Sequence, residues 1–159
     1  MPSNVRAGLA GAAVLLAVAV IAWATGLLGE SAEDQVNAVA DDFHGQLSAD
    51  RLDAAMSHLD PTVAPVEVRG PSLMGGPGFT RVYGNGALPD LRRDALRALA
   101  PVMGETFTEL RRSVEMADDD EAASVALELL STSRGTVRVE LGVVRDGERW
   151  LVRKVAVSR

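Results

Sequence analysis

The chain has 159 residues, no cysteine and a formal net charge of −6, a length that allows one ordinary domain after the apolar N-terminal segment is set aside. Arg6 is the only charged side chain among residues 1–29, so residues 30–159 carry a formal charge of −7 and are a poor partner for nucleic acid. The lack of cysteine excludes disulfides, thiolate metal sites, thiol nucleophiles and a lipid-attachment cysteine.

An apolar segment near the start predicts a membrane span. Residues 7–29 contain no charged side chain, and about 22 residues at ~1.5 Å each cross a hydrocarbon layer of ~30 Å. Arg6 precedes this segment and Glu30 follows it, so the positive-inside tendency places residues 1–6 in the cytoplasm. We therefore expect a single-pass anchor in the cell membrane, with residues 30–159 forming one domain outside the cytoplasm.

A cleaved signal peptide is the competing interpretation of the same segment. Ala22-Trp23-Ala24 has the small-x-small form of a processing site. However, apolar character continues to Leu28, and the run exceeds the ~7–15 residues of a signal core, which favours the uncleaved anchor. Cleavage after Ala24 would give a secreted domain, so both interpretations export residues 30–159.

Three segments carry the spacing of amphipathic helices. Their apolar faces are Val36, Val39, Ala40, Phe43 and Leu47 in the first, Leu52, Ala55, Met56 and Leu59 in the second, and Leu88, Leu91, Ala95, Leu99 and Val102 in the third. Ser48 suits the N-cap of the second helix, which Pro61 ends. Pro89 suits the first turn of the third helix, and Pro101 should end or bend it.

Proline and glycine interrupt the chain between the second and third helices. Residues 60–89 contain five prolines and six glycines, which exclude a long regular element. Short strands are predicted at 63–68 and 79–83. The connection between them, residues 71–78, is long enough that we expect it to face a ligand or to be loosely ordered.

From Thr106 onward the apolar period becomes two, which is the period of strands. The apolar residues of the expected strands are Leu110, Val114 and Met116; Ala123, Val125, Leu127 and Leu129; Val137, Val139, Leu141 and Val143; and Trp150, Leu151, Val152, Val155 and Val157. Asp146-Gly147 is a two-residue hairpin signal between the last two strands. We therefore expect four antiparallel strands at the end of the chain.

This order of elements resembles the NTF2-like superfamily, in particular its SnoaL-like and membrane-anchored bacterial members. The residues that carry the resemblance are VADDFHGQL at 39–47, DRLDAAMSHL at 50–59 and DGERWLVRKV at 146–155. The resemblance covers residues 33–158. It implies an α+β fold in which an N-terminal transmembrane helix precedes a cone of three helices packed on a curved, mostly antiparallel sheet of four to six strands.

The resemblance does not imply one activity, since members include steroid isomerases, dehydratases, small-ligand binders and structural assembly modules. Four aromatic residues are candidates for the lining of an apolar pocket: Phe43, Tyr83, Phe107 and Trp150. Aromatic residues at such positions also form ordinary core. An isomerase-like site would need a carboxylate base and an oxyanion donor, and Tyr83 is the only tyrosine.

The other ionisable residues near the helices have simple structural explanations. They are His44, His58, Asp41, Asp42, Asp50 and Asp53. A boundary hydrogen bond explains His44, while His58 projects away from its apolar face and is assigned no role. Capping and solubility explain the aspartates, so no catalytic residue is assigned. With two histidines and no cysteine we expect no metal and no cofactor.

The charged residues of the predicted strands favour surface pairing over an anion site. They are Glu109, Arg111, Arg112 and Glu115 in the first strand, and Arg138, Glu140, Arg153 and Lys154 in the last two. The acidic tract 118–121 is typical of a solvated turn. The Gly-rich segment lacks the Lys-Ser/Thr ending of a phosphate-binding loop, so nucleotide binding is not expected.

Two functional hypotheses follow from these observations. The first is a membrane-anchored, non-catalytic envelope module for protein interaction or assembly, whose partner is an envelope protein or a second copy of the chain. The alternative is a carrier of a small apolar ligand, or an isomerase- or dehydratase-like enzyme, that uses the aromatic pocket. The size and polarity of that cavity distinguish the two.

Overall fold

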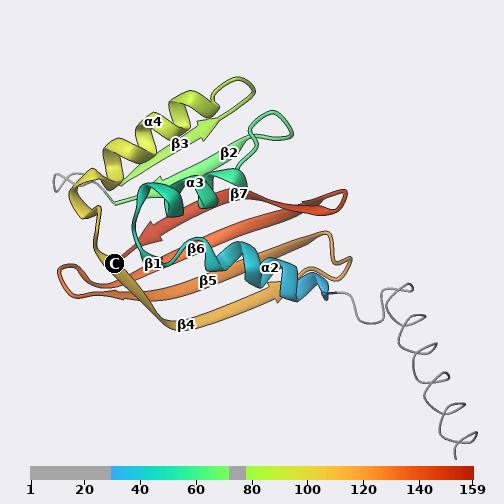
Figure 1. The fold of residues 1–159 in the computed structure, drawn as a ribbon. Coiled ribbons are helices and arrows are strands. Elements are labelled where there is room, and N and C mark those ends of the chain that lie inside the picture. Colours follow the sequence, from blue (N-terminus) through green and yellow to red (C-terminus); the bar gives the residue numbers. More distant parts are fainter. Residues whose placement is uncertain (1–29, 72–77) are drawn as a thin grey trace, which may run out of the picture. The chain divides into compact units, whose positions relative to one another are not determined.

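Three helices lie over one face of a curled, seven-stranded sheet in the computed structural model, which describes residues 30–71 and 78–159 (Figure 1). The helices are α2 (Ala32–Asp41), α3 (Ala49–Ser57) and α4 (Leu88–Leu99), with a 3₁₀ turn η1 (Ala100–Val102) after the last. The strands are β1 (Gly45–Gln46), β2 (Val66–Gly70), β3 (Phe79–Tyr83), β4 (Thr106–Met116), β5 (Ala122–Ser131), β6 (Gly135–Asp146) and β7 (Arg149–Ser158). The α+β class is therefore as expected.

The sheet is mixed, with the strand order β1-β4-β5-β6-β7-β2-β3. Every neighbouring pair is antiparallel except β2 and β7, which run parallel. Seven strands exceed the four to six that the resemblance implied. The difference arises because both short strands of the Pro/Gly-rich region form, and because β1 adds a two-residue pairing with β4.

The first helix is shorter than its apolar pattern predicts. Val36, Val39 and Ala40 are buried as expected, but α2 ends at Asp41. Gly45 then adopts a φ of 95°, a left-handed conformation that a helix does not contain. The chain thereby turns into β1, whose Gly45 pairs with Phe107 of β4.

The signals at the other helix ends are confirmed. The Ser48 hydroxyl accepts a hydrogen bond from the Arg51 backbone N–H at 3.1 Å, which caps α3. Pro89 lies in the first turn of α4, and Pro101 falls in the 3₁₀ turn that follows Leu99. Each of these residues fixes a boundary that the sequence predicts.

The core lies between the helices and the sheet. Val125, Leu127 and Leu129 of β5 are at most 3% exposed. They alternate with Ser124, Ala126, Glu128 and Leu130, which face away from the helices. One face of β4–β7 is therefore covered by helices. The opposite face carries mainly polar side chains together with Ala126 and Leu130, and we call it the open face.

Two details of the strands differ from expectation. Leu110 is 54% exposed because the register between β4 and β5 shifts between Glu109 and Arg111, which leaves Leu110 at a bulge. At the last hairpin Asp146 pairs with Arg149, so the two loop residues are Gly147 and Glu148 rather than Asp146 and Gly147. Gly147 takes a φ of 62°, which the first position of a type II′ turn requires.

The predicted anchor and the middle of the Gly-rich loop lie outside the described residues, because residues 1–29 and 72–77 are not described. Within residues 30–71 and 78–159, no helix combines the length and the hydropathy that a membrane crossing requires. The anchor at 7–29 and the cleavage after Ala24 therefore stay predictions.

Candidate functional site

The four aromatic candidates all belong to the covered side of the sheet. Tyr83 and Trp150 are 7% and 4% exposed, and Phe43 and Phe107 are half-buried against the same core cluster. Trp150 Nε1–H donates a hydrogen bond to Gln35 Oε1 of α2 at 3.2 Å. The fold thus brings the four rings to one core, and a ligand cavity among them stays a prediction.

Tyr83 forms a closed polar contact between β3 and α4. Its hydroxyl donates to Asp94 Oδ2 at 2.9 Å, and the same carboxylate oxygen accepts a hydrogen bond from Arg81. Burial raises the pKa of Tyr83, while the hydrogen bond from Tyr83 lowers the pKa of Asp94. The tyrosine is therefore a neutral donor to an ionised carboxylate, an arrangement that clamps α4 onto the edge strand.

His44 lies in a second cluster, which is centred on Arg112 of β4. Arg112 Nη2 donates to Asp41 Oδ1 at 2.6 Å and to Glu109 Oε2 at 2.5 Å, and it lies 3.1 Å from His44 Nε2. Arg112 Nη1 also donates to the Asn37 carbonyl at 3.1 Å. Its hydrogen bond lowers the pKa of Asp41. The cluster joins the carboxyl-terminal half of α2 to β4.

His58, to which the sequence assigns no role, has one in the fold. Its Nε2 lies 2.8 Å from Asp42 Oδ2, and Arg51 Nη1 lies 3.4 Å from the other oxygen of the same carboxylate. The His58 backbone carbonyl also accepts a hydrogen bond from the Val152 N–H at 2.8 Å. His58 therefore links the end of α3 both to the segment after α2 and to β7. Helical periodicity cannot reveal this contact, because Asp42 follows α2 and His58 follows α3, and the contact depends on how the two helix ends meet.

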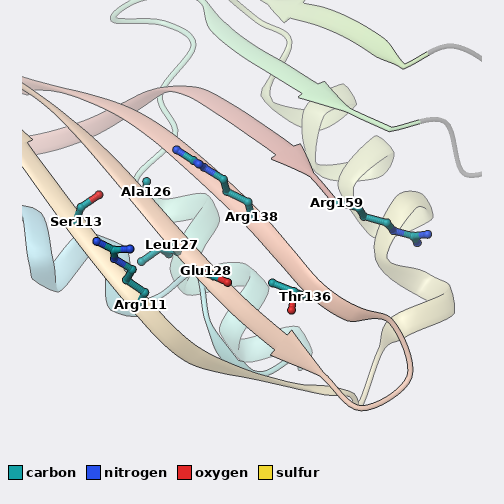
Figure 2. Close-up of a pocket in the computed structure, with 8 residues that line it drawn as sticks. All are labelled: Arg111, Ser113, Ala126, Leu127, Glu128, Thr136, Arg138 and Arg159. Carbon is teal, nitrogen blue, oxygen red and sulfur yellow. The ribbon is translucent and has the colours of Figure 1, made fainter.

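The open face contains a hollow formed by residues of β4, β5 and β6. Its volume is about 460 Å³, and Figure 2 shows the residues that line it, which come from β4, β5, β6 and the end of the chain. The lining residues are Arg111, Ser113, Ala126, Leu127, Glu128, Thr136, Arg138 and Arg159. We call it the arginine hollow, because three guanidinium groups and a single carboxylate side chain surround it.

The pairing register explains how this hollow forms. In the strand register Arg111 lies opposite Glu128, and Glu128 lies opposite Arg138, so alternating charges run across β4, β5 and β6. The neighbouring cross-strand row holds Ser113 and Ala126, whose short side chains form the bottom of the hollow. Long side chains thus border a floor of small ones.

A smaller hollow of about 230 Å³ adjoins the first and shares Ser113, Ala126 and Arg138 with it. Its other side chains include Glu115, Ser124, Glu140 and Lys154. Small residues again form the depression, since a Cβ added to Gly142 would lie 3.2 Å from Lys154 Cβ. Cationic and anionic groups are balanced in this second hollow, whereas the first is mainly cationic.

The predicted ion pairs between the charges of β4 and those of the last two strands do not form among the described residues. Arg138 instead pairs with Glu140 on its own strand at 3.1 Å, and Arg112 pairs with Glu109 on its own strand. Arg153 Nε instead donates to the Pro65 carbonyl. Within the part of the chain that the structure describes, neither Arg111 nor Arg159 has an ion-pair partner. Nor do the described residues bring together three side chains able to hold a metal ion.

Comparison with known proteins connects this architecture to solved structures. A protein of unknown function with a cystatin-like fold from Nostoc punctiforme aligns with a TM-score of 0.54 at 11% identity, over 77% of this chain and 86% of that chain. An NTF2-like protein of unknown function from Shewanella baltica aligns with a TM-score of 0.50 at 9% identity, over 79% and 91%. A similar protein from Shewanella oneidensis gives 0.45 at 15% identity, over 79% and 90%.

These likenesses concern the fold. No protein-family profile matches the sequence, and no curated protein matches it either. The fold is NTF2-like, as the resemblance implied, with three helices on a curled half-barrel of seven strands. Because this scaffold serves unrelated activities, the function has to be argued from the site.

Proposed function

We propose that this chain is a membrane-tethered, non-catalytic binding module of the cell envelope, anchored by residues 7–29, whose domain contacts its partner through the open face. The observation that carries the proposal is the arginine hollow, in which Arg111 and Arg159 lack ion-pair partners among the described residues. The arginine guanidinium is the side chain best suited to bind a carboxylate or phosphate of a partner.

The non-catalytic part of the proposal rests on how the ionisable groups of the covered side are used. Tyr83 of β3 is bonded to Asp94 of α4, Arg112 of β4 to Asp41 of α2, and Asp42, just after α2, to His58, just after α3. Each of these contacts joins two elements of secondary structure or their ends. The ionisable side chains that an enzyme of this fold would use for catalysis therefore have a structural role in this chain. We accordingly assign the function to binding at the open face.

The tether is tested by fractionating cells that express the full chain. We expect the chain in the membrane pellet, resistant to an alkaline wash, with residues 30–159 digested by protease added to spheroplasts and protected in inverted vesicles. Digestion from the cytoplasmic side would contradict the topology. The intact mass of the purified protein distinguishes the anchor from a chain cleaved after Ala24.

The open face is tested with a photo-crosslinking residue placed in the full chain in cells. At Ser113, which borders both hollows, we expect a defined cross-linked product. The same residue at Arg97, on the exposed surface of α4, is the matched control and should give none. Equal products from both positions, or products from Arg97 alone, would contradict a contact through the open face.

The alternative function, a small apolar-ligand carrier or isomerase-like enzyme, is favoured by one observation. The Tyr83 hydroxyl and the Asp94 carboxylate meet beside the apolar core, and the pKa of Tyr83 is raised by burial. This alternative predicts saturable binding of an apolar fluorescent dye with one site per chain, lost on Trp150→Ala and altered by Tyr83→Phe. A dye that does not bind saturably argues against it.

A further inference from the structure

We propose that the arginine hollow receives the acidic turn 118–121 of a second copy of this chain. The inference rests on the proposed function, because it names the partner of the same open face. It concerns two surfaces of one chain that carry opposite charge. The cationic surface is the hollow on β4–β6, and the anionic surface is the turn between β4 and β5.

The hollow carries more positive charge from its arginines than its own carboxylate side chain neutralises. Arg111, Arg138 and Arg159 line it, while Glu128 is its one carboxylate side chain. Among the described residues only Arg138 of the three arginines has an ion-pair partner, Glu140. A chain with a formal charge of −6 thus presents a depression lined mainly by cationic side chains. An acidic segment fits it by charge.

The turn offers the complementary charge in a preformed shape. Asp118, Asp119, Asp120 and Glu121 are all exposed, and in the described part of the chain none of them forms a salt bridge. The Ala117 N–H donates to the Ala122 carbonyl at 2.8 Å, and Asp119 Oδ1 accepts from the Glu121 N–H at 3.1 Å. Since these bonds already fix the turn, its docking costs little ordering entropy.

The turn of one molecule cannot fill that molecule's own hollow. Arg111 and Met116 lie on the same strand, so at ~3.3 Å per residue the guanidinium-bearing row is about 17 Å from the end of β4 where the turn begins. The strand between them is rigidly paired with β5. The contact is therefore between copies, and it is head-to-tail, so it can continue beyond a dimer. Anchoring in one membrane raises the effective concentration of the copies.

The first test mixes two defective variants of the full chain in nonionic detergent and measures their assembly by sedimentation velocity at low salt. We expect the unaltered chain to form oligomers beyond the dimer. R111Q/R138Q removes two of the hollow's three arginine charges and D118N/D120N removes two of the turn's four acidic charges, and each should weaken self-association about tenfold or more. Their equimolar mixture retains one good hollow and one good turn, so it should form dimers and nothing larger.

Matched controls remove the same charges elsewhere. R93Q/R97Q on α4 and D90N/E148Q, at two exposed positions, should assemble like the unaltered chain. A chain that stays monomeric at every concentration overturns the inference. So does self-association that survives both defective variants, or a mixture of the two that does not dimerise.

The second test uses the absence of cysteine from the chain. Full-length S113C mixed with full-length E121C should form a disulfide-linked dimer under mild oxidation, whereas S57C on α3 mixed with E121C should not. Equal yields from the two mixtures contradict the docking. If the Ser113 photo-crosslink described above joins a different protein, this inference fails while the binding-module function stands. If Ser113 gives no product, the proposed use of the open face fails as well.

Discussion

Glu105 shows how one side chain can hold distant parts of this fold together. It lies just before β4, and its Oε2 accepts hydrogen bonds from the Ser133 hydroxyl at 2.5 Å and the Ser131 hydroxyl at 2.7 Å. Its backbone carbonyl accepts a bond from the Leu47 N–H at 2.8 Å. Ser131 is only 1% exposed, so the carboxylate satisfies a buried hydroxyl at the end of the β5–β6 hairpin.

This environment predicts a pH dependence of stability. The two serine hydroxyls lower the pKa of Glu105 below its ordinary value of 4.5. A lowered folded-state pKa stabilises the fold above the ordinary value, and the stabilisation is lost as the pH falls through the folded-state value. Glu105→Gln should therefore lower the thermal midpoint near pH 7 and flatten its decline toward about pH 3. Circular dichroism of the full chain measures both.

Glu148→Gln is the control for that experiment, because Glu148 is exposed in the β6–β7 turn. It should leave the pH profile unchanged. An identical acid decline in Glu105→Gln and the unaltered chain would show that the serine contacts do not hold Glu105 in its ionised form in solution.

At the scale of elements, two adjacent arginines of β4 have opposite roles. The Arg112 side chain is 17% exposed and bonded to Asp41, Glu109 and Asn37 on the covered side. Arg111 is exposed and lines the arginine hollow on the open face. Alternation along a strand sends neighbours to opposite faces. Arg112 therefore serves the attachment of α2, and Arg111 is available to a partner.

The adjacent pair provides a matched comparison of stability. Arg112→Gln should reduce the free energy of unfolding by about 2 kcal/mol, because carboxylates lose their partner in a half-buried site. Arg111→Gln should change it by less than about 0.5 kcal/mol. Hydrogen exchange should show faster exchange of the α2 amides in Arg112→Gln alone. Equal destabilisation by the two variants would contradict the assigned roles.

Two glycines provide a second comparison of stability: Gly147 in the last hairpin and Gly84, just after β3. Gly147 has a φ of 62°, so Gly147→Ala should cost about 1 kcal/mol of unfolding free energy through backbone strain. Gly84 does not have a positive φ, and a Cβ added there meets no atom within 4 Å. Gly84→Ala should be neutral or slightly stabilising. Chemical denaturation of both variants tests this, and a neutral Gly147→Ala would argue against the loop formed by Gly147 and Glu148.

The sequence predicts the elements well where periodicity carries the signal. Val36 and Val39 identify the buried face of α2, and Val125 and Leu127 identify that of β5, because helix and strand periods differ. Local chemistry limits the prediction at the ends of elements. The apolar series of the first helix continues past Asp41 even though the backbone turns into β1.

The candidate site is much less predictable than the elements. Arg111, Glu128 and Arg138 become neighbours only through the pairing register of three strands, and a register is set by tertiary packing rather than by local sequence. The contact between Asp42 and His58 likewise depends on how two helices meet. The spacing of charges along the chain identifies the exposed face of the strands but cannot show which charges lack partners.

At the scale of the whole molecule, the proposed function combines a tether with a surface. The described domain has one face filled by its helices and one open face with a cationic hollow. A sheet face left uncovered by its own helices is available to a partner, and a membrane anchor would concentrate that partner near it. Because α2 begins at Ala32, just after the predicted span of residues 7–29, the domain is expected to lie close to the bilayer.

The most direct test of this account is single-cysteine labelling of intact cells, which the absence of native cysteine permits. A membrane-impermeant maleimide should label Glu148→Cys, in the exposed β6–β7 turn, on protein that fractionates with the membrane. Ser3→Cys should be labelled only after lysis. Labelling of Ser3→Cys with protection of Glu148→Cys in intact cells, or recovery of the full-length chain in the soluble cytoplasmic fraction, would contradict the tethered module.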